Sequence, residues 1–380
     1  MKKFEKFIFI NKINKNNKKD LVIKNNINNN NNNKFIEKDL IKLRIYYFDI
    51  LRIVCSFSVI LIHVSARYNK LNINSNNWKI AFYYNGIARF GVPVFFMMSG
   101  ALFLNKDISF KEIFNKYIKN LLIKLIFWSF IYSIYRINLS KKNIPKIAVA
   151  FFSGNYHFWF LKVIIELYLI TPFLREIIKK DLLNLFINLS FIFTFIIPNI
   201  YINNSHFPQM ISRILEIIKK KLNFKYIKGF IFYFMFGNYL NNNKIPIYKV
   251  IIVYILGIIG FLFTTIILYK ISIMKQKKYI HYFRALNLNI LLYSTSIFIL
   301  FKLNLNNYKK KQLMKNITNY TFGIYLIHPL ILALIRRIIG DFASIKILFT
   351  IPLISLIVFL LSLIISIIIK SIPFLGKYLI

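Results

Sequence analysis

Apolar runs of about 18 to 25 residues recur along most of this chain and limit what it can fold into. A helix needs about 20 such residues to cross a bilayer, whereas the strands of a membrane barrel are half as long and alternate polar with apolar residues. These runs do not alternate. The sequence therefore predicts an all-α fold, a polytopic integral membrane helical bundle.

We expect about ten transmembrane helices from these runs. The predicted spans lie near residues 46–66, 80–104, 118–137, 156–174, 182–202, 228–241, 247–269, 285–301, 318–338 and 344–370.

The charge of the chain is strongly positive, with 53 Lys and Arg against 12 Asp and Glu and a formal net charge of +41. In a soluble protein this charge would suggest nucleic acid as a partner. Here 57% of the residues are hydrophobic and the lysines cluster in tails and loops between the apolar runs. We therefore expect anionic membrane lipids as partners and no nucleic acid.

Residues 1–44 form a separate region, a basic tail rich in asparagine and lysine. Such a composition cannot bury a core, so the tail is predicted to be largely disordered. It holds 12 Lys and Arg directly before the first span, which predicts a cytoplasmic N-terminus by the positive-inside rule. The loops alone do not support this orientation, which therefore rests on the tail and on the family resemblance described below.

Cysteine and histidine spacing gives little sign of a cofactor site. The single cysteine, Cys55, excludes an intramolecular disulfide. No Cys/His spacing typical of a metal site and no glycine-rich phosphate loop are present, so no metal is expected.

The stretch Tyr46–Val64 carries ionisable residues inside apolar sequence. At about 100° per residue, Asp49, Arg52, Ser56 and His63 fall within one stripe of a helix, with Arg52 and His63 roughly 16 Å apart along its axis. Ionisable groups at membrane depth are costly and usually functional. The stripe indicates either a catalytic helix or a structural Asp49–Arg52 salt bridge with an unrelated histidine.

Arg52 followed after ten residues by His63 resembles the signature of the acyltransferase-3 family of integral membrane O-acyltransferases, which modify surface polysaccharides. Three further segments resemble the same family in the same order. They are RFGVPVFFMMSG (Arg89–Gly100), YHFWFLKVIIELYLITPFLR (Tyr156–Arg175) and FGIYLIHPLIL (Phe322–Leu332).

This resemblance implies a membrane acyltransferase domain over residues 45–380, in a multi-pass protein of the bacterial inner membrane. It also implies an enzyme, an O-acetyltransferase, that takes an acyl group, most simply acetyl, from cytoplasmic acetyl-CoA as co-substrate. The acceptor would be a hydroxyl of a cell-envelope glycan or of a lipid-linked sugar.

Essential roles for Arg52 and His63 are what the resemblance implies, and the division of labour between them is our hypothesis. O-acylation needs a base for the hydroxyl proton and a positive group near the carbonyl oxygen or the donor. Histidine suits the first task, so His63 is the expected base, and Arg52 is expected to bind the donor. Asp49, which we also count among the substrate-binding residues, would orient Arg52. Ser56 is more simply a packed serine than an acyl-enzyme nucleophile.

The other segments supply the expected substrate-binding residues. Arg89 and Ser99 would lie beside the active helix, although Arg89 could instead anchor the end of its span. His157 is expected to contact the acceptor, and Trp159 could do so or belong to an interfacial aromatic belt. His328 fits the family phrase, yet a histidine packed between helices explains it as well.

Lys162 and Glu166 are unexpected in their segment. Their i, i+4 spacing suggests that the two charges neutralise each other.

Two other functions stay open at this point. A transporter or flippase of a polysaccharide or lipid precursor would also carry intramembrane charges and broken helices, although it has no stated need for the Arg52–His63 spacing. A non-catalytic membrane scaffold would use the basic tail to bind anionic lipid.

Overall fold

The computed structural model describes residues 45–136, 144–202, 210–213, 227–305, 312–339 and 346–380. Within these ranges the chain is helical and has no strand, which confirms the predicted all-α membrane bundle. The helices described below belong to one compact unit, Tyr46–Ile380. The tail, residues 1–44, lies outside the described residues, and its disorder stays a prediction.

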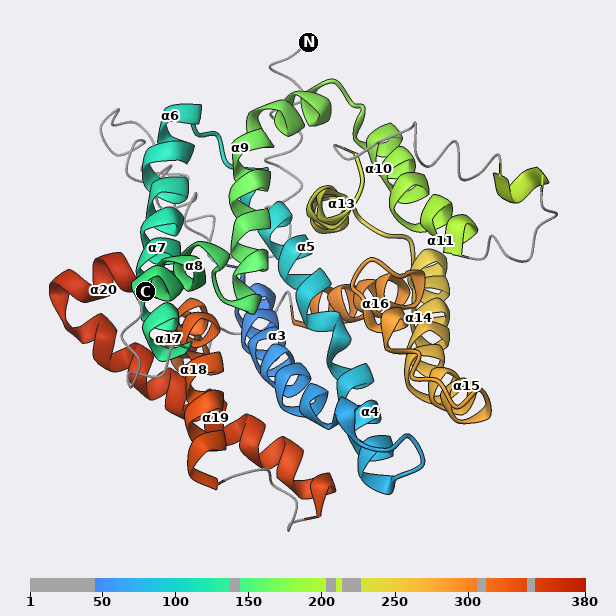
Figure 1. Cartoon of the computed structure of the whole chain (residues 1–380). Coiled ribbons are helices and arrows are strands. Elements are labelled where there is room, and N and C mark those ends of the chain that lie inside the picture. Colours follow the sequence, from blue (N-terminus) through green and yellow to red (C-terminus); the bar gives the residue numbers. More distant parts are fainter. Residues whose placement is uncertain (1–44, 137–143, 203–209, 214–226, 306–311, 340–345) are drawn as a thin grey trace, which may run out of the picture. The chain divides into compact units, whose positions relative to one another are not determined.

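The helices follow one another through short connections (Figure 1). Those of the first half are α3 (Tyr46–Ser65), η3 (Ala66–Lys70), α4 (Asn76–Ile87), η4 (Ala88–Phe90), α5 (Gly91–Phe103), α6 (Phe110–Glu112), η5 (Ile113–Ile118), α7 (Lys119–Arg136), α8 (Ile144–Ser153), η6 (Tyr156–Phe158) and α9 (Trp159–Lys179). Those of the second half are α10 (Leu183–Phe191), η7 (Ile192–Ile196), α11 (Ile197–Ile202), α13 (Phe230–Asn242), α14 (Ile247–Leu262), η9 (Phe263–Ile267), α15 (Leu268–Met274), η10 (Ile280–Phe283), α16 (Leu288–Leu305), α17 (Gln312–Thr318), α18 (Thr321–Ile339), α19 (Ile347–Ser371) and α20 (Pro373–Leu379).

Eight helices in the described ranges are long and apolar enough to cross a membrane. They are Tyr46–Lys70, Asn76–Phe103, Phe110–Tyr135, Ala148–Lys179, Ile247–Met274, Ile280–Leu305, Thr321–Ile338 and Ile347–Ser371. The two other predicted spans, 182–202 and 228–241, are helical but shorter. A helix of 13 residues such as α13 is about 20 Å long, less than the roughly 30 Å of a hydrocarbon core. The predicted count of about ten is therefore not confirmed.

α3 is the central helix of the unit. It packs against α4 and α5 on one side and against α18 and α19 on the other (Figure 1). Its apolar residues Leu51, Ile60 and Val64 are fully buried between these neighbours. Any polar group on α3 is consequently surrounded by protein rather than by lipid.

α5 and α13 cross with their backbones in contact. A Cβ atom on Gly100 would overlap the carbonyl oxygen of Phe234, and one on Gly237 would overlap the carbonyl oxygen of Met97. Small residues permit such close approach, which gives van der Waals contact that lipid cannot replace. This crossing holds the short α13 against the bundle.

Hydrogen bonds between helices and loops mark two ends of the unit. At the end where α3 begins, Tyr47 donates to the Asn241 side chain (2.6 Å) and Arg175 donates to the Phe103 carbonyl oxygen (3.0 Å). At the other end Lys278 donates to the carbonyl oxygens of Asn69 and Leu71. We name these the Tyr46 end and the Lys70 end.

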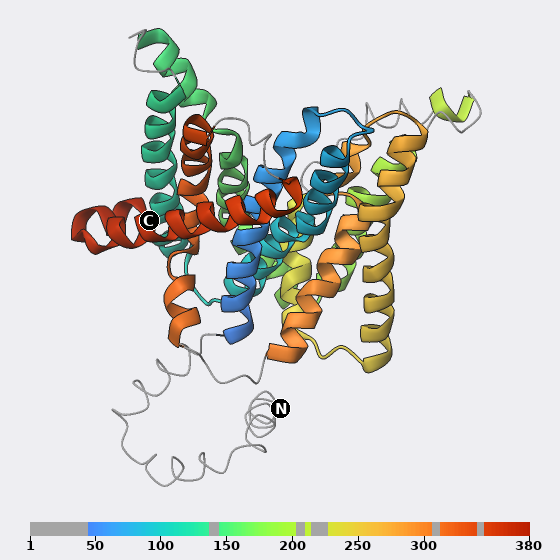
Figure 2. The same cartoon turned by 90° about the horizontal axis from the view of Figure 1, so that it is seen from below.

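The C-terminal helix α19 lies across its neighbours. In Figure 2 the red α19 crosses the blue α3 at a steep angle. α19 contacts α3, α4 and α18, and Trp128 of α7 donates to the carbonyl oxygen of Leu379 in α20 (3.0 Å). Large apolar side chains such as Leu353 and Leu360 of α19 stay exposed, as expected for a surface that faces lipid.

Candidate functional site

A cavity of about 380 Å³ lies beside α3, and we name it the central cavity. α3, η4, α5, α7, η6, α9 and α18 enclose it. Its lining residues are Arg52, Val59, Ile62, His63, Arg89, Val92, Phe95, Ser99, Leu121, His157, Trp159, Phe160, Leu161, Ile164, Tyr168, Thr321, Phe322 and Tyr325. Six of the predicted site residues are among them: Arg52, His63, Arg89, Ser99, His157 and Trp159.

Arg52 and His63 line the same cavity from two levels of α3. Ten residues lie between them, and the eleven-residue step corresponds to roughly 16 Å along the helix axis. Arg52 is on the side of the Tyr46 end and His63 on the side of the Lys70 end. One ligand about as long as this separation could contact both side chains.

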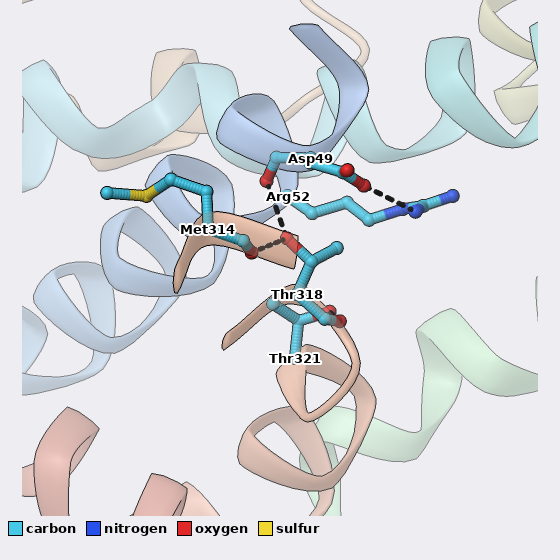
Figure 3. Close-up of polar contacts among 5 residues, drawn as sticks. All are labelled: Asp49, Arg52, Met314, Thr318 and Thr321. Carbon is cyan, nitrogen blue, oxygen red and sulfur yellow. Dashed lines mark hydrogen bonds and ion pairs between the residues drawn. The ribbon is translucent and has the colours of Figure 1, made fainter. Parts of the chain in front are cut away.

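Asp49 is buried and pairs with Arg52, with 3.6 Å between Oδ1 and Nη1 (Figure 3). The hydroxyl of Thr318 donates to the backbone oxygens of Asp49 (3.1 Å) and Met314 (2.8 Å), which ties α17 to the start of α3. The side chain of Asp49 does not line the central cavity. Its position suits orienting the guanidinium rather than binding a substrate.

Three histidines gather toward the Lys70 end of the central cavity. The ring of His63 stacks on His328, with centroids 5.4 Å apart, and His157 lies edge-on to His328 at 5.8 Å. Nδ1 of His328 lies 3.1 Å from the carbonyl oxygen of Ile324. Because a carbonyl oxygen only accepts, this bond requires the proton on Nδ1 and leaves Nε2 of His328 as an acceptor. His328 is itself buried behind the lining.

Tyr325 holds this histidine group together. Its hydroxyl donates to the backbone oxygen of His157 (2.7 Å), and its ring lies 5.4 Å from the His157 ring. It joins α18 to η6, directly before α9, and also lines the central cavity.

Arg89 is fixed by Asn85, one turn earlier on the same helical segment. Nε of Arg89 donates to Asn85 Oδ1 at 2.8 Å, and Nη2 also donates to this oxygen. The Asn85 amide nitrogen in turn donates to Ser65 Oγ (2.9 Å) and to the Ile62 carbonyl oxygen (3.2 Å) on α3. Asn85 is therefore a buried bridge between Arg89 and the end of α3 that carries His63.

The serines of the site bond to their own helices. Ser56 donates to the Arg52 carbonyl oxygen (2.8 Å) and Ser99 to the Phe95 carbonyl oxygen (2.8 Å). These bonds fit packing, as expected for Ser56, although Ser99 also lines the cavity.

Lys162 and Glu166 lie on the exposed face of α9 and form no ion pair within 4 Å. The structure therefore does not confirm the expected pairing of the two charges. Within the described residues no group of three His, Cys, Asp or Glu could hold a metal ion.

A larger cavity of about 700 Å³ adjoins the first toward the Lys70 end, and we name it the outer cavity. The two cavities share Ile62, Arg89, Val92 and Trp159. Its other lining residues are Phe193, Thr194, Pro198, Lys228, Gly229, Phe230, Phe283, Arg284, Ala285, Leu286 and Asn287. Arg89 and Trp159 thus stand where the two cavities meet.

Residues 45–371, which include Arg52 and His63, match the family model of an acyltransferase domain. The chain belongs to this acyltransferase family. Comparison with curated proteins and with solved structures found no match. Membership of the family, together with the apolar helices, makes the chain a multi-pass membrane acyltransferase.

Sequence reasoning missed several residues that line or support the two cavities. Asn85 carried a signal, since an asparagine in an apolar run sits four residues before Arg89. Tyr325 lay inside the recognised phrase but was not singled out. Lys228 and Arg284 were not singled out, and only the fold brings them to one cavity.

Proposed function

We propose that this acyltransferase transfers an acetyl group from acetyl-CoA, a co-substrate on the cytoplasmic side, to a hydroxyl of a cell-envelope glycan or lipid-linked sugar. In the reaction the acceptor oxygen attacks the thioester carbonyl carbon, the C–S bond breaks, and CoA leaves as a thiol. The acceptor proton passes to a base, and the thiolate sulfur takes up a proton. The observation that carries the proposal is the placement of Arg52, His63 and Arg89 around one cavity.

We assign the base to His63. The histidine lines the central cavity near its junction with the outer cavity, where a hydroxyl from the Lys70 end would meet a thioester from the Tyr46 end. A positioned general base contributes about 10²- to 10⁴-fold to the rate of such a transfer.

We assign different roles to Arg52 and Arg89. Arg52 lies roughly 16 Å from His63 along α3, so it would bind a phosphate or carbonyl group of the donor rather than the reacting carbonyl. Arg89 stands at the junction of the cavities, where its guanidinium can stabilise the negative charge that develops on the carbonyl oxygen. Asn85 acts through Arg89 by fixing its side chain.

The proposal places the protein in the bacterial inner membrane with its N-terminus in the cytoplasm. The Tyr46 end would then face the cytoplasm and the donor. The basic tail before Tyr46 supports this orientation through the positive-inside rule.

The test uses the purified full chain in proteoliposomes with acetyl-CoA labelled in its acetyl group and a glycan fraction from the host envelope. We expect label in the glycan for the wild type and for His281→Ala, whose imidazole lines neither cavity. His63→Ala should lose about 100-fold or more of the transfer rate. Undiminished transfer by His63→Ala would refute the base role. Passage of glycan across the membrane without covalent label would indicate a transporter instead.

A further inference from the structure

The outer cavity is unusually positive. Three cations line it: Arg89 from η4 at its inner side, and Lys228 and Arg284 with exposed side chains. No described residue of its lining is acidic. The ion pairs within the described ranges, Arg52–Asp49, Lys116–Glu112 and Lys179–Glu176, involve none of the three.

Like charges that share one cavity repel each other, and the repulsion is strongest where water is partly excluded. Arg89 has a hydrogen-bond acceptor in Asn85 and a ring neighbour in Phe283, 5.0 Å from its guanidinium carbon. Neither neighbour carries a negative charge. An anion bound in the cavity would relieve this repulsion.

The N-terminus of α13 adds a fourth source of positive potential to the outer cavity. α13 begins at Phe230, which lines the outer cavity, and its preceding residue Gly229 lies in the left-handed region with φ of 97°. The Gly229 N–H donates to Thr194 Oγ1 (2.9 Å), which fixes the start of the helix at this cavity. A helix N-terminus attracts anions through its unpaired N–H groups and its dipole.

We propose that the outer cavity binds a phosphate group of the acceptor. Two guanidinium groups and an ammonium group suit a phosphate, which carries more charge and more acceptor oxygens than a carboxylate. This inference rests on the proposed function. Because Trp159 and Arg89 border both cavities, a phosphate held in the outer cavity would leave the attached sugar at the junction, within the region of His63.

The phosphate could belong to a soluble glycan or to a lipid carrier. An apolar groove of about 490 Å³, lined by residues such as Phe195, Ile259 and Leu292, shares Asn287 with the outer cavity. A prenyl or acyl chain of a lipid-linked phosphate would fit such a groove. The experiment separates the two sources.

Binding to the full-length protein is measured by equilibrium titration in detergent micelles with three probes: inorganic pyrophosphate, farnesyl diphosphate and farnesol. We expect farnesyl diphosphate to bind and farnesol to bind much more weakly. Arg284→Gln and Lys228→Gln should each weaken the binding of the phosphate probes about tenfold, the loss of one charge-assisted hydrogen bond. Lys275→Gln removes an exposed cation at the same end that lines neither cavity, and should bind like the wild type.

Pyrophosphate that binds as tightly as farnesyl diphosphate would identify a soluble phosphate source, and a clear preference for farnesyl diphosphate would identify a lipid carrier. Either result supports a phosphate site if Arg284→Gln and Lys228→Gln both weaken the binding of the phosphate probes. No binding of either phosphate probe to the wild type, or equal binding by the wild type and both variants, overturns the inference.

A kinetic measurement separates this inference from the proposed function. Arg284→Gln should raise KM for a phosphorylated acceptor about tenfold and leave KM for acetyl-CoA and kcat unchanged. A rise in KM for acetyl-CoA alone would place the donor in the outer cavity and overturn the inference. His63→Ala should lose about 100-fold or more of the transfer rate and still bind farnesyl diphosphate. If the wild type binds the phosphate probes but transfers no acetyl group, the proposed function fails while the phosphate site stands.

Discussion

Asn85 shows how much a single amide does at the residue scale. It accepts from Arg89 through its oxygen and donates to α3 through its nitrogen, so the guanidinium keeps a fixed direction without a carboxylate beside it. A carboxylate at this position would neutralise the charge of Arg89. The neutral amide positions the guanidinium and leaves its charge for a ligand.

His328 is the second residue whose surroundings suggest a specific role. Its ring stacks on His63, and its Nδ1–H donates to Ile324, so it is held rigidly behind the proposed base. We expect it to be a positioning residue rather than a catalytic residue. His328→Ala should lower kcat about tenfold, because the His63 ring loses its neighbour and moves.

His328→Phe is the matched variant, since a phenyl ring restores the stacking surface without the nitrogen atoms. We expect it to recover most of kcat, measured with labelled acetyl-CoA at saturating substrate. If His328→Phe were as impaired as His328→Ala, Nε2 itself would take part in the reaction.

Residue spacing shows how much of the site could be predicted from the sequence. The helical spacing of Arg52 and His63 predicted that both point to one side of α3, and the structure places both on the central cavity. The same reasoning failed for Lys162 and Glu166, because i, i+4 spacing brings two side chains near each other without deciding whether lipid, water or protein surrounds them. The chemical roles of Arg52 and His63 stay predictions.

At the scale of elements, α13 is the helix that shapes the outer cavity. It is short, it begins at the cavity, and glycines hold it against α5. Sequence analysis predicted a helical segment at 228–241 but not this contact. Lipid and protein present similar apolar surfaces to a membrane helix, so hydropathy gives the helices and not their partners.

Gly237 offers a test of this contact. A Cβ at Gly237 would overlap the backbone oxygen of Met97, which cannot move aside as a flexible side chain could. Gly237→Ala should therefore separate α13 from α5 and lower the thermal unfolding temperature by several degrees. Thermal unfolding in detergent measures this shift.

Ile255→Ala, on the exposed face of α14, is the control and should unfold near the wild-type temperature. A Gly237→Ala protein as stable as the control would mean that the two helices do not touch through their backbones.

At the scale of the whole molecule, the two ends of the bundle have different functions in our proposal. Orientation can be measured because the chain has one cysteine, Cys55, and it is buried. Asn74 is exposed at the Lys70 end and Asp107 is exposed at the Tyr46 end. Because both side chains are exposed, we expect the bundle to tolerate cysteine at each position.

With a membrane-impermeant thiol reagent on intact cells or spheroplasts, Asn74→Cys should be labelled and Asp107→Cys should be labelled only after the membrane is opened. The wild type is the control and should stay unlabelled in both conditions, because Cys55 is inaccessible. The opposite pattern would reverse the orientation and bring the donor to the Lys70 end.

The shared border of the two cavities at Arg89 and Trp159 has one more consequence. Under our proposal, only two carbons and an oxygen need to pass that border in each turnover. The nucleotide carrier would remain on the side where metabolism makes it, and the sugar would remain on the side where the envelope is built, so a covalent exchange would accomplish what otherwise takes a pump.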